Sequence, residues 1–138
     1  MAREIKFRGY NRKNKEWLYG FYLQNRGAHF VCPDEFAVNK SWDDYEIDPA
    51  TLGQFTGLHD KNGREIYEGD VVKFENRNML PNVGVVTYWE DDCMFVCDSG
   101  VGVFELEKRY VTGEHLSEYK YNSYVFIGNI HDNPELMT

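Results

Sequence analysis

Hydrophobic and polar positions alternate over the first ten residues. Ile5 and Phe7 fall on one face, and charged residues that include Arg8 fall on the other. A period of two predicts a strand with one buried face and one exposed face. The polar stretch "NRKNKE" separates this strand from the aromatic run "WLYGFYL", from Trp17 to Leu23. Two apolar runs joined by a short polar turn predict an opening β-hairpin.

No single period covers residues 29–47, although "HFVC" and "EFAV" have the apolar character of short strands. Asp48-Pro49 then resembles the start of a helix, because Asp suits the N-cap and Pro suits the first helical position, where its missing N–H has no partner. We therefore expect one helical turn over "DPATLGQF". We also expect a boundary there, between an N-terminal β-rich portion, residues 1–50, and a second domain, residues 51–138.

From Gly53 onward, short apolar runs alternate with Gly, Asn and Asp at the density typical of a β-sandwich or small barrel. The predicted strands cover 53–57, 64–67, 70–75, 83–90, 94–97, 101–107 and 124–130. A short helix within 107–120 is an open alternative. No stretch of 12 or more residues has a helical period, so the pattern predicts a mainly β protein with little helix.

The stretch "TGLHDKNGREIYEGDVVKF", from Thr56 to Phe74, is rich in charged residues, but its apolar residues recur at regular spacing. Asn62-Gly63 predicts a hairpin turn, since Gly takes positive φ without steric cost, and "EGD" at 68–70 predicts a second reversal. Ile66, Val72 and Phe74 are predicted to pack in the core. "IYEGDVV" resembles the diverging turn that leads into a strand of small SH3-like barrels. A calcium loop is excluded, because counting from Asp60 the Gly falls at the fourth position rather than the sixth.

The chain of 138 residues has 42% apolar and 16% aromatic residues, so it can bury a sizeable core without a metal or a disulfide. Three cysteines are an odd number and indicate reduced thiols. No secretory segment and no long apolar run is present in the sequence. These features predict a cytoplasmic protein that does not enter membranes.

The net charge is −8, which disfavours nucleic acid and anionic membranes as partners. The charge is uneven: six of the 15 basic residues and only one acid lie in the first fifteen positions. One interpretation is a solvated strand edge whose Lys and Arg residues prevent aggregation. The other is a basic edge that docks onto an acidic face, within the fold or between subunits.

Two clusters have the residue types of a metal or catalytic site. His29, Cys32, Cys93 and Cys97 supply the inventory of a structural zinc site. However, Cys93 and Cys97 on one strand would lie roughly 13 Å apart, so we expect small buried thiols and no metal or cofactor. The acids of "EDD" at 90–92 and Asp43, Asp44, Glu46 and Asp48 are predicted to form solvated loops, with paired catalytic carboxylates as the alternative.

Nothing else in the sequence has the pattern of a catalytic site. "SGVGVF" at 99–104 lacks a third glycine and a following helix, so it predicts a hairpin turn and not a phosphate cradle. No nucleophile elbow accompanies His59. The candidate interaction surface instead combines the basic hairpin with an aromatic groove: Lys6, Arg8, Arg12, Lys13, Lys15, Tyr67, Tyr88 and Trp89.

Three segments together closely resemble the YopX family of bacteriophage and prophage proteins: "REIKFRGY…WLYGFY", "DPATLGQFTGLHDKNGREIYEGDVVKF" and "YVFIGNIHDNPELM". The resemblance covers almost the whole chain. It implies an all-β protein with a β-rich N-terminal portion followed by an SH3-like barrel. It implies no activity and no catalytic residue, since the shared positions have turn or core roles: Gly53, Gly57, Gly63, Gly69, Asp70, Gly128, Asn129 and Pro134.

These observations favour a non-enzymatic phage or prophage accessory protein that acts through protein contacts, as a homo-oligomer or with a phage or host protein. A first alternative is a nucleic-acid-binding barrel that uses the basic hairpin, which the overall acidity disfavours. A second alternative is a small metal-dependent or acid–base enzyme built on the acidic loops with His59 or His115.

Overall fold

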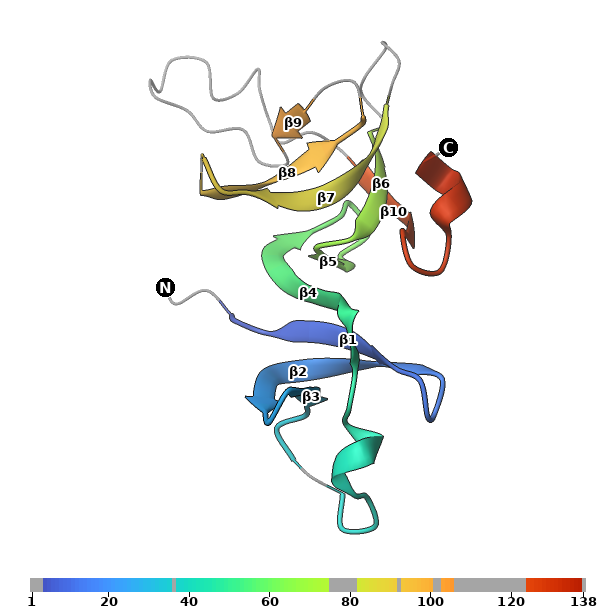
Figure 1. The fold of residues 1–138 in the computed structure, drawn as a ribbon. Helices are drawn as coiled ribbons and strands as arrows, with labels where there is room; N and C mark the ends of the chain where they lie inside the picture. Colours follow the sequence, from blue (N-terminus) through green and yellow to red (C-terminus); the bar gives the residue numbers. More distant parts are fainter. Residues whose placement is uncertain are drawn as a thin grey trace. The chain divides into compact units, whose positions relative to one another are not determined.

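The computed structural model describes residues 4–35, 37–74, 82–91, 93–100, 103–105 and 124–137. The fold is mainly β, as predicted (Figure 1). Its elements are β1 (Phe7–Asn11), β2 (Glu16–Asn25), β3 (Ala28–Cys32), the 3₁₀ helix η1 (Trp42–Asp44), β4 (Asp48–His59), β5 (Glu65–Tyr67), β6 (Asp70–Phe74), β7 (Val83–Trp89), β8 (Met94–Asp98), β9 (Val103–Glu105), β10 (Tyr124–Asn129) and the 3₁₀ helix η3 (Pro134–Met137).

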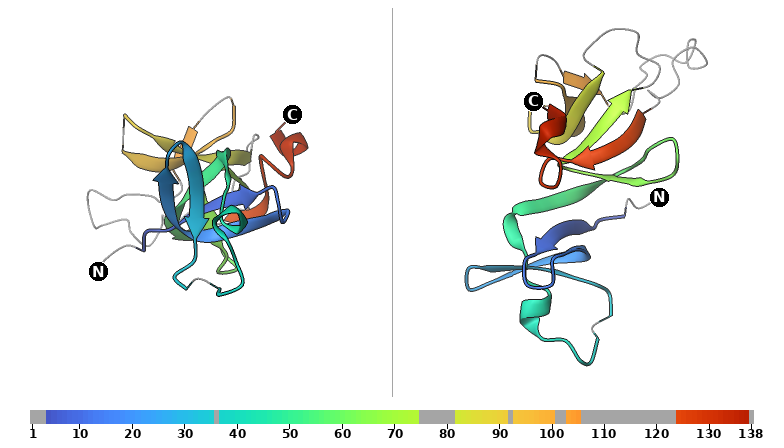
Figure 2. Two further views of the ribbon diagram at one scale, coloured as in Figure 1. Left: turned by 60° about the horizontal axis from the view of Figure 1, so that its bottom comes forward. Right: turned by 90° about the vertical axis from the view of Figure 1, so that its right-hand side faces the viewer.

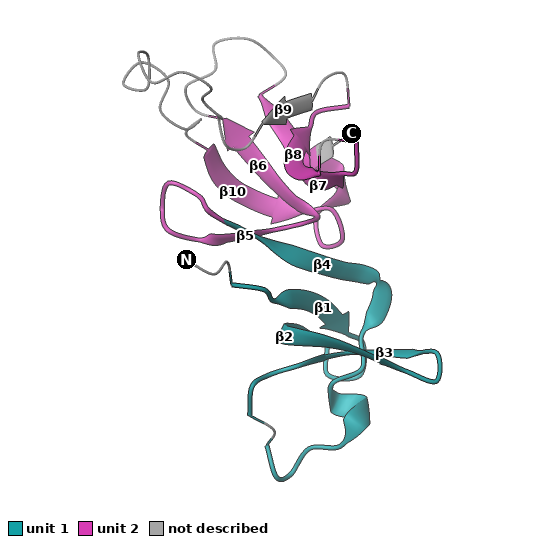
Figure 3. Ribbon diagram, turned by 90° about the vertical axis from the view of Figure 1, so that its left-hand side faces the viewer, with its two compact units in different colours: residues 1–57 teal, residues 58–138 magenta. Residues whose placement is uncertain are grey.

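The chain divides into two compact units, unit 1 with residues 1–57 and unit 2 with residues 58–138 (Figure 3). The sequence placed the domain boundary after residue 50, which is inside β4. The strand β4 itself continues through this position, and its last two residues, Leu58 and His59, belong to unit 2.

The predicted opening hairpin forms unit 1 together with β3 and most of β4 (blue and green in Figure 2). The first half of β2 pairs antiparallel with β1, and its second half pairs antiparallel with β3. The two halves meet at Gly20, where φ is 154° and an added Cβ would lie 1.9 Å from the carbonyl oxygen of Cys32. Only glycine allows this close approach of the two strands.

The expected helical turn over "DPATLGQF" is wrong, because these residues begin β4. The ladder with β1 pairs Tyr10 with Asp48 and Arg8 with Gly53, so extra residues bulge out between the two pairs. Asp48 Oδ1 accepts a hydrogen bond from the N–H of Ala50 at 3.1 Å. An acceptor side chain followed by a proline suits an irregular edge as well as a helix start, since proline has no donor to lose from the ladder. Pairing with β1 decides between the two.

Two further expectations for unit 1 need correction. Ile5 is 65% exposed and Arg8 is only 3% exposed, the reverse of the predicted faces. The Arg8 guanidinium lies 4.8 Å from the centre of the Trp17 ring, which covers its planar face. "HFVC" is strand as predicted, but the described residues of "EFAV" form none, and Val38 there is fully exposed.

Unit 2 contains an antiparallel sheet in the order β10-β6-β7-β8-β9. Each of the predicted strands in this part of the chain is present, to within a few residues at its ends. The described core contains side chains from β5, β6, β7, β8 and β10: Ile66, Val72, Phe74, Val86, Cys97 and Tyr124. Closure of this sheet as an SH3-like barrel stays a prediction, and the alternative helix within 107–120 lies outside the described residues.

The predicted turn at Asn62-Gly63 is confirmed, and Asp60 does more than begin it. Gly63 has φ 83°, and the N–H of Asp60 donates to the carbonyl of Arg64 at 2.9 Å. The Asp60 carboxylate accepts hydrogen bonds from the N–H groups of Asn62 and Arg64 within the turn, and from that of Phe126 in β10 at 3.0 Å. One buried carboxylate therefore holds the turn and the edge strand β10 together.

Replacing Asp60 by Asn is expected to destabilise unit 2 by roughly 2–3 kcal/mol near neutral pH, since hydrogen bonds to a charged acceptor are lost. Burial raises the pKa of Asp60, but the three N–H donors and the Arg64 charge outweigh it and leave the pKa below its ordinary value. The contribution is therefore present above the unfolded pKa of about 3.9 and is lost as the pH falls through the folded pKa.

Urea unfolding of both proteins from about pH 7 to about pH 2 measures this difference, which should shrink in acid. Asp98→Asn is the control, because within the described residues Asp98 accepts a single hydrogen bond, from the N–H of Gly100, at an exposed turn. Equal stability of Asp60→Asn and the wild type at neutral pH would contradict the role of the carboxylate.

Candidate functional site

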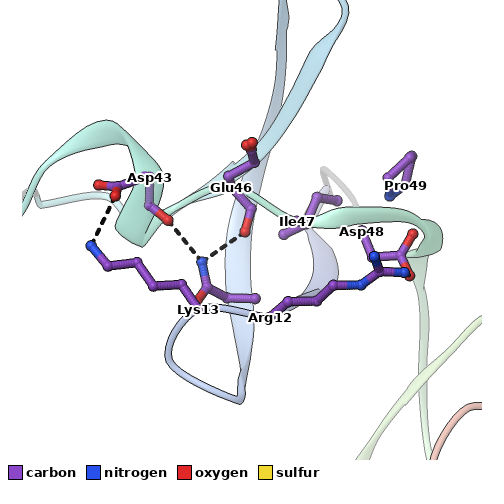
Figure 4. A pocket seen from close by; sticks show the side chains of 8 residues that line it. Arg12, Lys13, Asp43, Glu46, Ile47, Asp48 and Pro49 are labelled. Atoms are coloured by element: carbon purple, nitrogen blue, oxygen red, sulfur yellow. Dashed lines mark hydrogen bonds and ion pairs between the residues drawn. The ribbon is translucent and has the colours of Figure 1, made fainter.

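A hollow of about 470 Å³ in unit 1 lies between the β1–β2 turn and the segment that runs from η1 into β4 (Figure 4). The basic turn supplies one wall and the acidic segment the other. The lining residues are Asn11, Arg12, Lys13, Asp43, Glu46, Ile47, Asp48 and Pro49. The fold thus brings together a predicted basic region and a predicted acidic region that are about thirty residues apart in sequence.

Asn11 connects the two walls. Its side chain is 1% exposed, and its Nδ2 donates to the carbonyl oxygens of Asp43 at 3.1 Å and Glu46 at 2.7 Å. Its Oδ1 accepts a hydrogen bond from the N–H of Asn14 at 2.7 Å, inside the hairpin turn. A single amide therefore satisfies backbone groups on both sides. Sequence analysis missed this residue, since nothing in an Asn at the start of a turn indicates a partner so distant in the chain.

Two cations of the turn, Arg12 and Lys13, are paired with carboxylates of the acidic segment. Lys13 Nζ lies 2.9 Å from Asp43 Oδ2 and 3.0 Å from Asp44 Oδ1. Arg12 Nη2 lies 2.5 Å from Asp48 Oδ2. The sequence allows two interpretations of the basic N-terminus. Arg12 and Lys13 fit the second one, in which basic residues dock onto an acidic face within the fold. Exposed ion pairs contribute little stability each, so their main effect is to neutralise charge.

Two of these carboxylates have their pKa lowered by different groups of Ser41. The Ser41 hydroxyl donates to Asp43 and, with the bond from Lys13, lowers the pKa of Asp43. The Ser41 backbone N–H donates to Asp44 Oδ2 at 2.9 Å and, with Asn14 and Lys13, lowers the pKa of Asp44. The hydrogen bonds to Asp43 and Asp44 raise the pKa of Lys13. All three groups thus stay charged over the physiological range.

The other basic candidates in unit 1 have different environments. Lys6 Nζ lies 3.3 Å from Glu4 Oε1 and 5.3 Å from the centre of the Phe55 ring. Arg8 is buried, so it does not contribute to an exposed surface. Lys15 is exposed at the end of the β1–β2 turn, with φ 55°.

The aromatic candidates in unit 2 do not form one groove. Tyr67 is 2% exposed, and its hydroxyl donates to Glu65 Oε1 at 3.2 Å. Its large side chain therefore packs inside the unit and offers no surface. Tyr88 and Trp89 are 43% and 42% exposed at the end of β7, where Tyr88 packs edge-on against Phe95.

A second exposed aromatic pair, which sequence analysis did not single out, lies on β2. Tyr19 and Phe21 are 47% and 43% exposed. They are two positions apart on a strand and so share a face. The signal was present in "WLYGFYL", but this run is apolar at almost every position, so its period could not show which residues face solvent.

The cysteines and histidines considered for metal or acid–base chemistry have different environments. Cys32 and Cys97 are buried in unit 1 and unit 2, respectively, and Cys93 is exposed. Burial raises the pKa of the Cys32 thiol. Within the described ranges, no three His, Cys, Asp or Glu side chains are close enough to hold a metal ion together. His59 is exposed at the end of β4, and His115 lies outside the described residues.

The comparisons with known proteins agree with the fold. The family model described as YopX protein matches residues 6–138. The chain belongs to the YopX family. A crystal structure of protein EF1440 from Enterococcus faecalis is similar to this YopX protein, with a TM-score of 0.55 and 26% sequence identity, over 99% of this chain and 100% of the other. No curated protein matches the chain. In the described part of this YopX protein, no helix has the length and apolar character to cross a membrane.

Ser41→Ala is expected to raise the pKa of Asp43 more than that of Asp44. The substitution removes the hydroxyl, which donates to Asp43 and makes a longer bond of 3.4 Å to Asp44 Oδ2, but it keeps the backbone N–H that donates to Asp44 at 2.9 Å. Carboxyl-carbon NMR titration of the wild type and the variant measures both values. Asn14→Ala is the matched control, because Asn14 Nδ2 donates to Asp44 and not to Asp43. A pKa of Asp43 that is the same in Ser41→Ala and the wild type would refute this assignment.

Proposed function

We propose that this YopX protein is a non-enzymatic accessory protein of a phage or prophage, which acts in the host cytoplasm through protein contacts and self-association. Membership of the family supports the phage or prophage origin. Arg12 and Lys13 support a non-enzymatic role, because both are paired with carboxylates across the hollow in unit 1.

One observation carries the proposal of protein contacts: each unit exposes a pair of aromatic side chains. These are Tyr19 and Phe21 on β2 and Tyr88 and Trp89 on β7, all between 42% and 47% exposed. Tyr, Trp and Phe are enriched in the cores of protein interfaces, where they bury a large area with few rotatable bonds. Two pairs are more than the isolated exposed apolar residues that any soluble surface carries.

The expected strength of such a contact follows from the area that these rings leave exposed. Complete burial of a large apolar side chain contributes about 1.5–3 kcal/mol, so covering a ring that is already half-buried adds about 1 kcal/mol. A micromolar complex requires about 8 kcal/mol. One aromatic pair therefore does not suffice, and a specific contact must use further groups around it.

The double substitution Tyr19→Ser/Phe21→Ser is expected to weaken self-association by about 30-fold, which corresponds to the loss of about 2 kcal/mol. Sedimentation velocity over a dilution series measures the dissociation constant, and far-UV circular dichroism checks the fold. Val38→Ser is the control, because Val38 is fully exposed but stands alone. A wild-type protein that remains a monomer at all concentrations would refute the self-association.

A further inference from the structure

We infer that YopX copies associate through oppositely charged aromatic surfaces, with the β2 surface of one copy bound to the β7–β8 tip of another. The β2 surface consists of Lys15, Tyr19, Phe21 and Arg26. The β7–β8 tip consists of Tyr88, Trp89, Glu90 and Asp91. The inference rests on the self-association proposed above and names the groups that mediate it.

The β2 surface carries the cations that unit 1 leaves without a partner. In the described part of unit 1, Lys6, Arg12, Lys13 and Lys40 lie close to carboxylates, and Arg8 is buried against Trp17. Within the same residues, Lys15 and Arg26 are exposed and have no ion-pair partner. Both are in the turns that begin and end β2, at opposite ends of the strand (Figure 1).

Short turns fix the positions of both cations. Arg26 and Gly27 form the two-residue turn between β2 and β3, with φ 51° and 81°, the values of a type I′ hairpin turn. Lys15 has φ 55° immediately before β2. The exposed rings of Tyr19 and Phe21 lie between them along the strand. The β2 surface is thus an aromatic strip with a positive charge at each end that has no ion-pair partner among the described residues.

The β7–β8 tip has the opposite charge. Glu90 and Asp91 follow Trp89 directly in the turn, are exposed, and have no side-chain partner within the described residues. The turn is closed by the N–H of Cys93, which donates to the carbonyl of Glu90 at 3.2 Å. Packing against Phe95 holds the Tyr88 ring at the same end of the sheet, on the face opposite to that of its neighbour Trp89. Aromatic side chains beside free carboxylates suit a partner that presents Lys, Arg and further rings.

Charge complementarity favours a second copy as the partner. Each chain carries both surfaces, and each surface combines exposed rings with the charge opposite to that of the other. A nucleic acid is the weaker candidate, because it would meet the field of a chain with net charge −8. Because two different patches meet, such a contact is heterologous and can build a ring, unless two chains satisfy each other reciprocally.

Two charge-reversal variants test the inference. Variant A is Lys15→Glu/Arg26→Glu, and variant B is Glu90→Lys/Asp91→Lys. Each alone would place like charges against each other in every copy-to-copy contact, so the dissociation constant should rise at least tenfold. A mixture of A and B restores opposite charges in both kinds of contact. Sedimentation velocity of A, B and the equimolar mixture should therefore show association only in the mixture.

The controls carry similar charge changes elsewhere. Asp34→Lys/Glu35→Lys reverses two exposed acids of unit 1, and Lys73→Glu reverses an exposed lysine of β6. Both should associate as the wild type does. Association of the wild type should weaken between about 0.1 M and 1 M salt, as the Debye length falls from about 10 Å to about 3 Å. Circular dichroism verifies that each variant is folded.

The outcomes separate this inference from the proposed function. A wild type that is monomeric throughout overturns both. A wild type that associates, while A and B behave like the controls, overturns the pairing of surfaces and leaves self-association in place. Failure of the mixture to associate also overturns the pairing. Salt-dependent binding of a fluorescent oligo-dT by a monomeric wild type, lost in variant A, would reassign the β2 surface to single-stranded nucleic acid.

Discussion

Backbone donors at chain reversals must find acceptors, and this YopX protein meets that requirement with the side chains of Asp and Asn. Asn11 binds across the opening hairpin, Asp60 binds the turn before β5 together with β10, and Asp70 accepts from the N–H of Tyr67. At the C-terminal end, Asn129 Oδ1 accepts from His131 and Asp132. Strands this short depend on their turns. Many of the polar side chains that resemble a catalytic or metal site in the sequence are therefore required by the fold.

Several charged side chains in unit 1 are likewise satisfied within the fold. The basic turn and the acidic segment neutralise each other across the hollow, and Asn11 fixes them in register. The chain therefore gains a local charge balance although its net charge is −8. Among the described residues, Lys15 and Arg26 remain outside this balance and lie in hairpin turns, where a short turn can present a side chain in a fixed direction.

The strands were predictable from sequence because period-two patterns and glycine turns are local signals. The wrong predictions arose where the same local signals are ambiguous. Asp48-Pro49 fits a helix start and a strand bulge equally, and only pairing with β1 selects the bulge. Alternation alone could not show that Arg8 would be covered by Trp17 while Ile5 stays exposed. The hollow was less predictable still, because its ion pairs join residues thirty or more positions apart. The exposed rings of β2 could not be predicted either, because the run "WLYGFYL" is apolar at almost every position and does not show which rings are covered.

Lys15, Arg26 and Cys93 are the residues other than glycine with positive φ in the described part of the chain, and all three stand in hairpin turns beside an exposed aromatic pair. A residue with a Cβ is strained in this conformation by about 1 kcal/mol, whereas Gly adopts it freely and Asn tolerates it. An engineer who wished to raise the melting temperature would begin by placing Gly or Asn at these positions. Two of those exchanges would delete the unpaired cations of β2. The easiest gains in stability would thus come at the positions on which the proposed self-association depends.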